Sequence, residues 1–151
     1  MFFCSIAYSE DFNLICEGER KVRNLSGKEF NATDFEFVLL KIKKNSMEYI
    51  GVNSGRSYVF SNKEYTAPKR PPHEDIKIKV LYEFTQKTIK ASQTITDTGN
   101  SEESSISRLS LSINRLTGKL SEKESISNKK TLQKSMSNNF QAICKRVDRS
   151  Y

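Results

Sequence analysis

The chain has 151 residues, of which 36% are hydrophobic and 28% charged, and its formal net charge is +7. This length fits one domain, and nine Phe and six Tyr residues are enough for a modest core. One His and three Cys argue against a metal enzyme. No apolar run approaches the roughly 18 residues that a membrane-spanning helix needs.

The first nine residues carry no charge and are followed by an acidic pair. An apolar stretch that ends in small residues, here Ala7 and Ser9, is typical of the end of a secretory signal peptide. We therefore expect residues 1–9 to be a truncated signal remnant and 10–151 to form a single periplasmic or secreted domain. The alternative is that the same stretch forms a first β-strand in the core.

Cys16 and Cys144 lie near the two ends of the chain, each in phase with the apolar alternation of its own segment. If these two segments are neighbouring strands, both thiols point to the same buried side of a sheet. We then expect a disulfide, which stabilises a chain of this length by about 4–5 kcal/mol. Two unrelated buried thiols in a cytosolic protein are the alternative interpretation.

Period-two alternation dominates the chain, and long helical stripes are absent. The predicted strands, in chain order, cover residues 12–22, 35–42, 47–52, 57–60, 76–84, 89–95, 109–113 and 140–147. Gly18 breaks the phase of the first strand as a bulge glycine would. The apolar face changes within the second strand, which predicts that this strand is either bulged or covered on both sides. Seven to eight short, hairpin-linked strands predict an all-β fold, either a small antiparallel barrel or a sandwich.

Three segments lack a strand pattern. The proline-rich segment 67–72 is expected to run extended and exposed, because proline cannot join a central ladder. Residues 97–105 are rich in Ser, Glu, Gly and Asn without an apolar anchor, which predicts a mobile loop. Residues 121–139 are polar, with a weak helical pattern within 129–136.

Residues 111–118 read Leu-Ser-Ile-Asn-Arg-Leu-Thr-Gly. With an early Cys-x-Gly and the late Cys144, this segment resembles a loose group of small exported β-rich bacterial proteins that share an L-x-I-N-R-x-T/S-G stretch and have no assigned activity. Asn114 and Gly118 suit a tight turn, and Arg115 would stack or pair across the hairpin. A binding role for Asn114 and Arg115 is the alternative interpretation.

Residues 54–58 read Ser-Gly-Arg-Ser-Tyr and match the S-G-x-x-Y loop of the periplasmic inhibitors of c-type lysozyme, to which the chain is similar. Members of that family are small disulfide-linked β-barrels. Their loop serine, with a lysine from a following loop, bonds the catalytic carboxylates of lysozyme. The resemblance implies Ser54 as the inhibitory serine, Tyr58 as the end of the pattern and Lys63 as the candidate lysine. An ordinary hairpin turn explains Ser54 equally well.

The positive charge is concentrated toward the end of the chain, where lysines alternate with Ser, Asn and Glu rather than with aromatic residues. A single-strand nucleic-acid platform would need stacking aromatics. We therefore expect a solvated basic face that makes weak contact with anionic surfaces and has no specific nucleic-acid partner. A basic nucleic-acid or anionic-surface binder is the alternative.

Enzyme motifs are missing from the sequence. His73 stands alone in the proline-rich segment, and neither a nucleophile elbow nor a phosphate-binding loop occurs. We therefore expect a non-enzymatic exported binding or structural protein with no catalytic residue, metal site or cofactor. A secreted or periplasmic protein is the expected kind of partner, and its identity stays open.

Overall fold

The structure, a computed structural model, describes residues 11–24, 31–68 and 75–147, and the statements below concern these residues. They form ten antiparallel β-strands and include no helix, so the predicted all-β class is confirmed. The strands are β1 (Phe12–Asn24), β2 (Asn31–Ile42), β3 (Ser46–Gly51), β4 (Ser57–Ser61), β5 (Lys63–Ala67), β6 (Ile76–Phe84), β7 (Thr88–Asp97), β8 (Ser105–Asn114), β9 (Lys119–Asn128) and β10 (Lys134–Val147). The predicted signal remnant and most of the proline-rich segment lie outside the described residues. No helix within the described ranges has the length and apolar character to cross a membrane.

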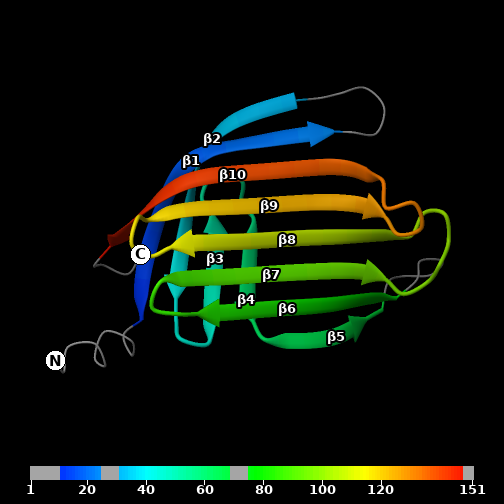
Figure 1. Cartoon of the computed structure of the whole chain (residues 1–151), viewed down its shortest axis with the longest axis horizontal. Helices are drawn as coiled ribbons and strands as arrows, with labels where there is room; N and C mark the ends of the chain where they lie inside the picture. The colour runs from blue at the N-terminus through cyan, green and yellow to red at the C-terminus, as the bar shows by residue number, and fades with distance from the viewer. Residues whose placement is uncertain (1–10, 25–30, 69–74, 148–151) are drawn as a thin grey trace.

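The ten strands belong to one sheet that follows the chain as a meander. Its order is β4-β3-β2-β1-β10-β9-β8-β7-β6-β5, so every neighbouring pair except β1 and β10 is consecutive in the chain. The sheet curls until β3 and β4 lie behind β6–β9 (Figure 1). The first and last strands thus lie side by side in the middle of the sheet.

The curled sheet is a nearly closed barrel with its seam between the edge strands β4 and β5. Asn62, the residue that links them, accepts the backbone N–H of Tyr82 on β6 at 2.8 Å and donates to the Tyr82 carbonyl at 3.2 Å. The Tyr82 hydroxyl donates to the carbonyl of Lys43, in the β2–β3 turn, at 2.7 Å. Side-chain hydrogen bonds therefore join the wall at the seam, where the backbone ladder is interrupted.

Cys16 and Cys144 are directly opposite each other on β1 and β10 and form a disulfide with a Cα–Cα distance of 4.0 Å. The predicted pairing of the first and last strands and the predicted disulfide are both confirmed. Both side chains are buried within the apolar core. The disulfide therefore links the first and last strands in the middle of the sheet, away from the seam.

The inward positions change from apolar to polar along the barrel. On β1 the inward residue after Cys16 and Gly18 is Arg20, and on β9 Leu120 is followed by Glu122. The antiparallel neighbours change in the same direction, from Val38 to Glu36 on β2 and from Phe140 to Asn138 on β10. One half of the interior is therefore a hydrocarbon core, and the adjoining part is polar and charged.

The bulge predicted at Gly18 is wrong, and so is the bulged alternative for the second strand. β1 and β2 keep an unbroken register with each other and with their other neighbours, so Gly18 has another role. A Cβ at Gly18 would lie 2.6 Å from the Cα of Ala142 on β10, a distance that no side chain accepts. Glycine is needed because the two strands come close beside the disulfide.

The predicted strand count of seven to eight is two or three short, because β5 and β9 were not recognised. The polar segment 121–139 contains most of β9 and the start of β10, and residues 129–133 form a turn in place of the weakly predicted helix. The predicted mobile loop 97–105 spans the end of β7 and the start of β8. The ammonium of Lys129 donates to the carbonyls of Asp97 and Gly99 at 2.8 and 2.7 Å, which anchors this segment.

Candidate functional site

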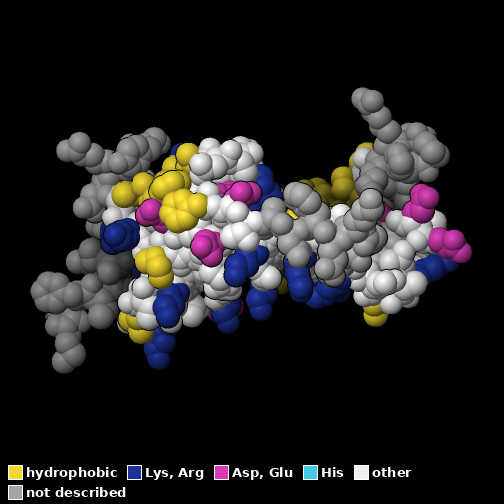
Figure 2. All heavy atoms as spheres, turned by 90° about the horizontal axis from the view of Figure 1, so that it is seen from above, with side chains coloured by type: hydrophobic (Ala, Val, Ile, Leu, Met, Phe, Trp, Pro, Cys, Tyr) yellow, Lys and Arg dark blue, Asp and Glu magenta, His cyan; other side chains and the backbone are white. Residues whose placement is uncertain are grey.

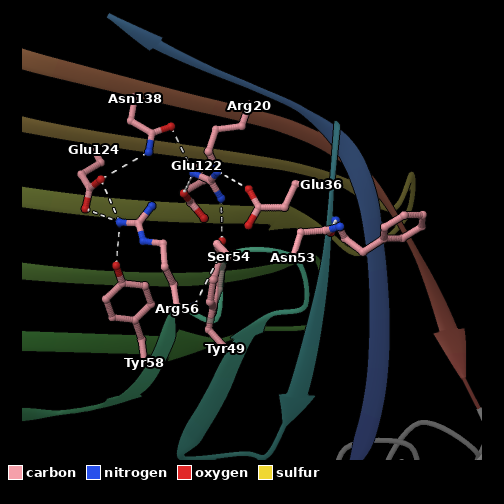
Figure 3. Close-up of polar contacts among 11 residues, drawn as sticks. Arg20, Glu36, Tyr49, Asn53, Ser54, Arg56, Tyr58, Glu122, Glu124 and Asn138 are labelled. Carbon is pink, nitrogen blue, oxygen red and sulfur yellow. Dashed lines mark hydrogen bonds and ion pairs between the residues drawn. The ribbon is translucent and has the colours of Figure 1, made fainter. Parts of the chain in front are cut away.

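A buried ion cluster occupies the polar part of the barrel, and Arg20 is its centre (Figure 3). Its guanidinium forms ion pairs with Glu36 from β2 and Glu122 from β9. It also donates to the hydroxyl of Tyr49 at 2.9 Å and to the side-chain oxygen of Asn138 at 3.1 Å. One arginine thus links β1 to four other strands, two of which, β3 and β9, are not neighbours of β1 in the sheet.

A second ion pair adjoins the first. Arg56, which lies just before β4, reaches across the barrel and donates to both carboxylate oxygens of Glu124 on β9, at 2.9 and 2.8 Å. The same guanidinium donates to the hydroxyl of Tyr58 at 2.7 Å. The amide of Asn138 donates to Glu124 at 3.3 Å and connects the two groups. These residues, with Arg20, Glu36, Tyr49 and Glu122, are called the ion cluster below.

The electrostatics of the ion cluster keep its arginines charged and its tyrosines protonated. Burial alone would lower the pKa of Arg20, but the hydrogen bonds and charges of Glu122 and Glu36 outweigh it and raise the pKa. Burial raises the pKa of Tyr49, and the charge of Glu122 raises it further. The pKa of Tyr58 is also raised, chiefly by burial. None of these three groups is poised to exchange a proton near neutral pH.

The carboxylates of the ion cluster are held by its arginines. Within the described residues, the second carboxylate oxygens of Glu36 and Glu122 have no hydrogen-bond partner. No three His, Cys, Asp or Glu side chains of the described part of the chain are grouped to hold a metal ion. The other oxygens of Glu36 and Glu122 are committed to Arg20. The ion cluster therefore links strands of the barrel wall to one another. Candidate binding residues lie on the surface.

Ser54 lies in the exposed turn between β3 and β4. The turn is closed by hydrogen bonds from Gly51 N–H to the Arg56 carbonyl at 2.8 Å and from Gly55 N–H to the Gly51 carbonyl at 2.9 Å. The hydroxyl of Ser54 accepts the N–H of Arg56 at 3.3 Å and lies over Gly51. Asn53 accepts the N–H of Phe37 at 3.0 Å, so the turn is fixed to β2. The predicted inhibitory serine thus has a structural contact within its own turn.

The other residues singled out by the sequence are not grouped with Ser54. Tyr58 belongs to the ion cluster, and Lys63 is exposed on the edge strand β5 with its ammonium 5.5 Å from the ring of Tyr65. Asn114 accepts two backbone N–H groups within its own turn. Arg115 donates to the carbonyl of Thr85 at 2.7 Å and lies over Phe84, as the stacking interpretation predicts. A binding role for these residues stays a prediction.

An exposed apolar surface lies beside the Ser54 turn, on the outer side of β10, β1 and β2. We call it the phenylalanine face, and it consists of Ile15, Glu17, Glu19, Phe35, Phe37, Leu39, Val52 and Ile143. Phe35 is 57% exposed and Val52 64% exposed. Ile15, Phe37, Leu39 and Val52 line a shallow hollow of about 320 Å³. Seen from above, the molecule presents hydrophobic side chains gathered beside acidic ones (Figure 2).

Two carboxylates interrupt the phenylalanine face. In the sheet register, Glu17 lies between Phe37 and Ile143, and Glu19 lies next to Phe35. Both glutamates are exposed, and neither forms an ion pair with another described residue. The face therefore offers apolar area together with two carboxylates, and the exposed lysines Lys21, Lys119 and Lys145 lie at its margins.

Sequence reasoning missed both the ion cluster and the phenylalanine face. The outward run Phe35, Phe37 and Leu39 was visible as alternation, but it was assigned to a strand that is bulged or covered on both sides instead of to an exposed surface. No signal in the sequence pairs Arg20 with Glu122, because 102 positions separate them.

No family model, no curated protein and no solved structure matches the chain.

Proposed function

We propose that this chain is a non-enzymatic, exported protein that binds a basic protein through its phenylalanine face. The observation that carries the proposal is the contiguous exposed apolar area on the outer side of β1 and β2. Monomeric soluble proteins rarely expose such patches unless they bind something. The interior offers a poor alternative, because Tyr49, Phe60 and Phe140 fill it and are each at most 1% exposed.

The charge on this face selects the kind of partner. Glu17 and Glu19 lie among apolar side chains, where a partner would cover them. Covering an unpaired carboxylate is costly, so a fitting partner supplies arginine or lysine there. The same charges would repel an anionic lipid surface. A basic protein therefore complements the face better than a membrane does.

A c-type lysozyme is the first partner to test, because the Ser-Gly-x-x-Tyr pattern borders the same face. Val52 and Ser54 share one turn, so a partner seated on Phe37 and Val52 would reach this turn as well. The Cys16–Cys144 disulfide supports export, since disulfides persist in oxidising compartments.

The test is titration of lysozyme activity and direct binding by calorimetry. We expect binding at micromolar concentration or tighter, and a loss of about tenfold or more for Phe37→Ser, since burying a Phe side chain is worth about 1.5–3 kcal/mol. Glu17→Gln/Glu19→Gln should weaken binding and reduce its salt dependence. Ser54→Ala reports whether the serine enters the cleft, in which case inhibition is lost while binding is weakened less.

Matched controls separate this face from general stickiness. Leu81→Ser removes another half-exposed apolar side chain, and Glu102→Gln/Glu103→Gln removes two exposed charges elsewhere. Both should bind as the unaltered protein does. The proposal is wrong if lysozyme and a second basic protein, cytochrome c, both fail to bind, or if Phe37→Ser and Leu81→Ser bind alike.

A further inference from the structure

The outer side of β6–β9 carries a second surface, whose chemistry is the opposite of that of the phenylalanine face. Four of its cations are Lys79, Lys90, Arg108 and Lys123, one from each strand and all exposed, and Lys77 on β6 and Lys119 on β9 point to the same side. None of the four forms an ion pair with a described residue. In the view from above, Lys and Arg side chains project along the lower margin, which corresponds to the side facing the reader in Figure 1 (Figure 2). Part of the positive charge of the chain is thus located on one side of the sheet.

Small hydroxyl side chains fill the space between these cations. Ser92 is directly opposite Ser110, and Ser110 is directly opposite Lys123. In the next row Lys90 is opposite Ser112. We call these serines and the four cations the lysine–serine face. Part of this face is a groove of about 650 Å³ along β6–β9, which is lined by Lys90, Lys123 and the serines and also by Leu81 and Glu83.

The register sets the spacing of the charges. Lys90 and Lys123 are two strands apart, as are Lys79 and Arg108, and neighbouring strands are about 4.8 Å apart. Lys79 and Arg108 share one row with Thr94 between them, about 10 Å apart across the strands, while Lys90 and Lys123 lie in neighbouring rows and are therefore farther apart, with Ser110 and Ser112 between them. Two carboxylates lie beside these cations: Glu83 is opposite Lys90, and Glu64 on β5 is opposite Lys79.

We propose that the lysine–serine face binds an acidic polysaccharide laid across strands β6–β9. The lysines and arginine pair with carboxylate groups that recur along the polymer, and the serines exchange hydrogen bonds with its hydroxyl groups. The groove admits a linear chain, whereas a flat bilayer surface cannot enter it. The outward side chains of β6–β9 include no aromatic residue, so nucleobases have nothing to stack on.

The experiment measures binding of polygalacturonate by calorimetry at about 50 mM salt and again at higher salt. We expect binding that weakens as salt rises and no binding of dextran, a neutral glucan. Lys90→Ala/Lys123→Ala should lose about tenfold in affinity, while the matched control Lys43→Ala/Lys44→Ala, in the β2–β3 turn, should lose little. Both double variants remove the same charge, so an equal loss would overturn the assignment of the site.

A second variant separates specific contacts from charge alone. Ser92→Ala/Ser110→Ala leaves the net charge unchanged and should reduce affinity about three- to tenfold through lost hydrogen bonds. An unchanged affinity would contradict the proposed role of the serines. Tighter binding of a single-stranded oligonucleotide or of phosphatidylglycerol vesicles than of polygalacturonate would overturn the choice of polysaccharide. Because lysozyme binding uses the other face, its failure leaves this result unaffected.

Discussion

Arg20 is the residue on which the interior depends most. It holds two carboxylates, Glu36 and Glu122, at a depth where neither could stay charged alone at low cost. The ring of Phe140 lies 4.6 Å from its guanidinium carbon and adds a cation–π contact. The stability of the polar part of the barrel therefore depends on a balance of charges more than on buried area.

Replacing Arg20 by a neutral side chain of similar length should leave the carboxylates of Glu36 and Glu122 without a counter-charge. We expect Arg20→Met to lower the free energy of unfolding by about 3–5 kcal/mol, because two buried carboxylates lose their counter-charge. Urea denaturation followed by tyrosine fluorescence measures this loss. Glu64→Gln, which breaks an exposed ion pair with Lys77, should leave the free energy of unfolding nearly unchanged.

A triple variant tests whether the loss of stability in Arg20→Met comes from the unpaired buried carboxylates. Adding Glu36→Gln and Glu122→Gln to Arg20→Met removes the buried charges, so part of the stability should return. If the triple variant is less stable than Arg20→Met, the charge-balance explanation is wrong. Packing of the arginine stem would then be the dominant contribution.

At the level of strands, the disulfide is the strongest constraint on the sheet. It joins β1 to β10, which are the two most distant strands in the chain and neighbours in the sheet. A loop of 128 positions gives a large entropic effect on the unfolded chain. We expect Cys16→Ala/Cys144→Ala to lose about 4–5 kcal/mol of stability, measured by thermal and urea denaturation.

Reductant provides the matched control for the disulfide. Under reducing conditions the unaltered protein should fall close to the stability of the double variant, while the variant should not respond. If reductant leaves the melting temperature of the unaltered protein unchanged, the bond does not stabilise the fold in the expected way.

The strands that the sequence predicts are those with apolar inward positions. β6 was recognised because Ile76, Ile78 and Val80 alternate with lysines. β9 was missed because its inward positions continue as Glu122 and Glu124, so the alternation has no contrast in hydrophobicity. The ion cluster could not be predicted for the same physical reason. The hydrophobicity pattern of one strand does not show that a charge on it is neutralised by a residue on a distant strand. The disulfide was predictable because both cysteines keep the apolar phase.

On the scale of the whole molecule, the weakest part of the barrel wall is the seam. Everywhere else neighbouring strands share a backbone ladder, while at the seam Asn62, which follows β4, bonds the backbone of Tyr82 on β6, and the Tyr82 hydroxyl bonds Lys43 in the β2–β3 turn. This meeting point lies far from the disulfide in the chain. Whether the barrel stays closed therefore depends on a few polar groups, of which Tyr82 is the titratable one.

Burial raises the pKa of Tyr82 from 10.0 to about 12, which makes the closure of the barrel sensitive to alkaline pH. Above pH 10 the unfolded chain releases this proton while the folded protein keeps it, so the stabilisation is complete below pH 10 and is lost as pH rises toward 12. We expect the free energy of unfolding to fall across this window and to fall less steeply in Tyr82→Phe. At neutral pH the variant should be about 1 kcal/mol less stable, because the hydrogen bond to Lys43 is gone.

Tyr65→Phe, at a half-exposed position on β5, is the control and should keep the full alkaline slope. Equal slopes for the unaltered protein and Tyr82→Phe would mean that the seam does not sense this proton, and the loss of stability would then come from the tyrosines of the ion cluster.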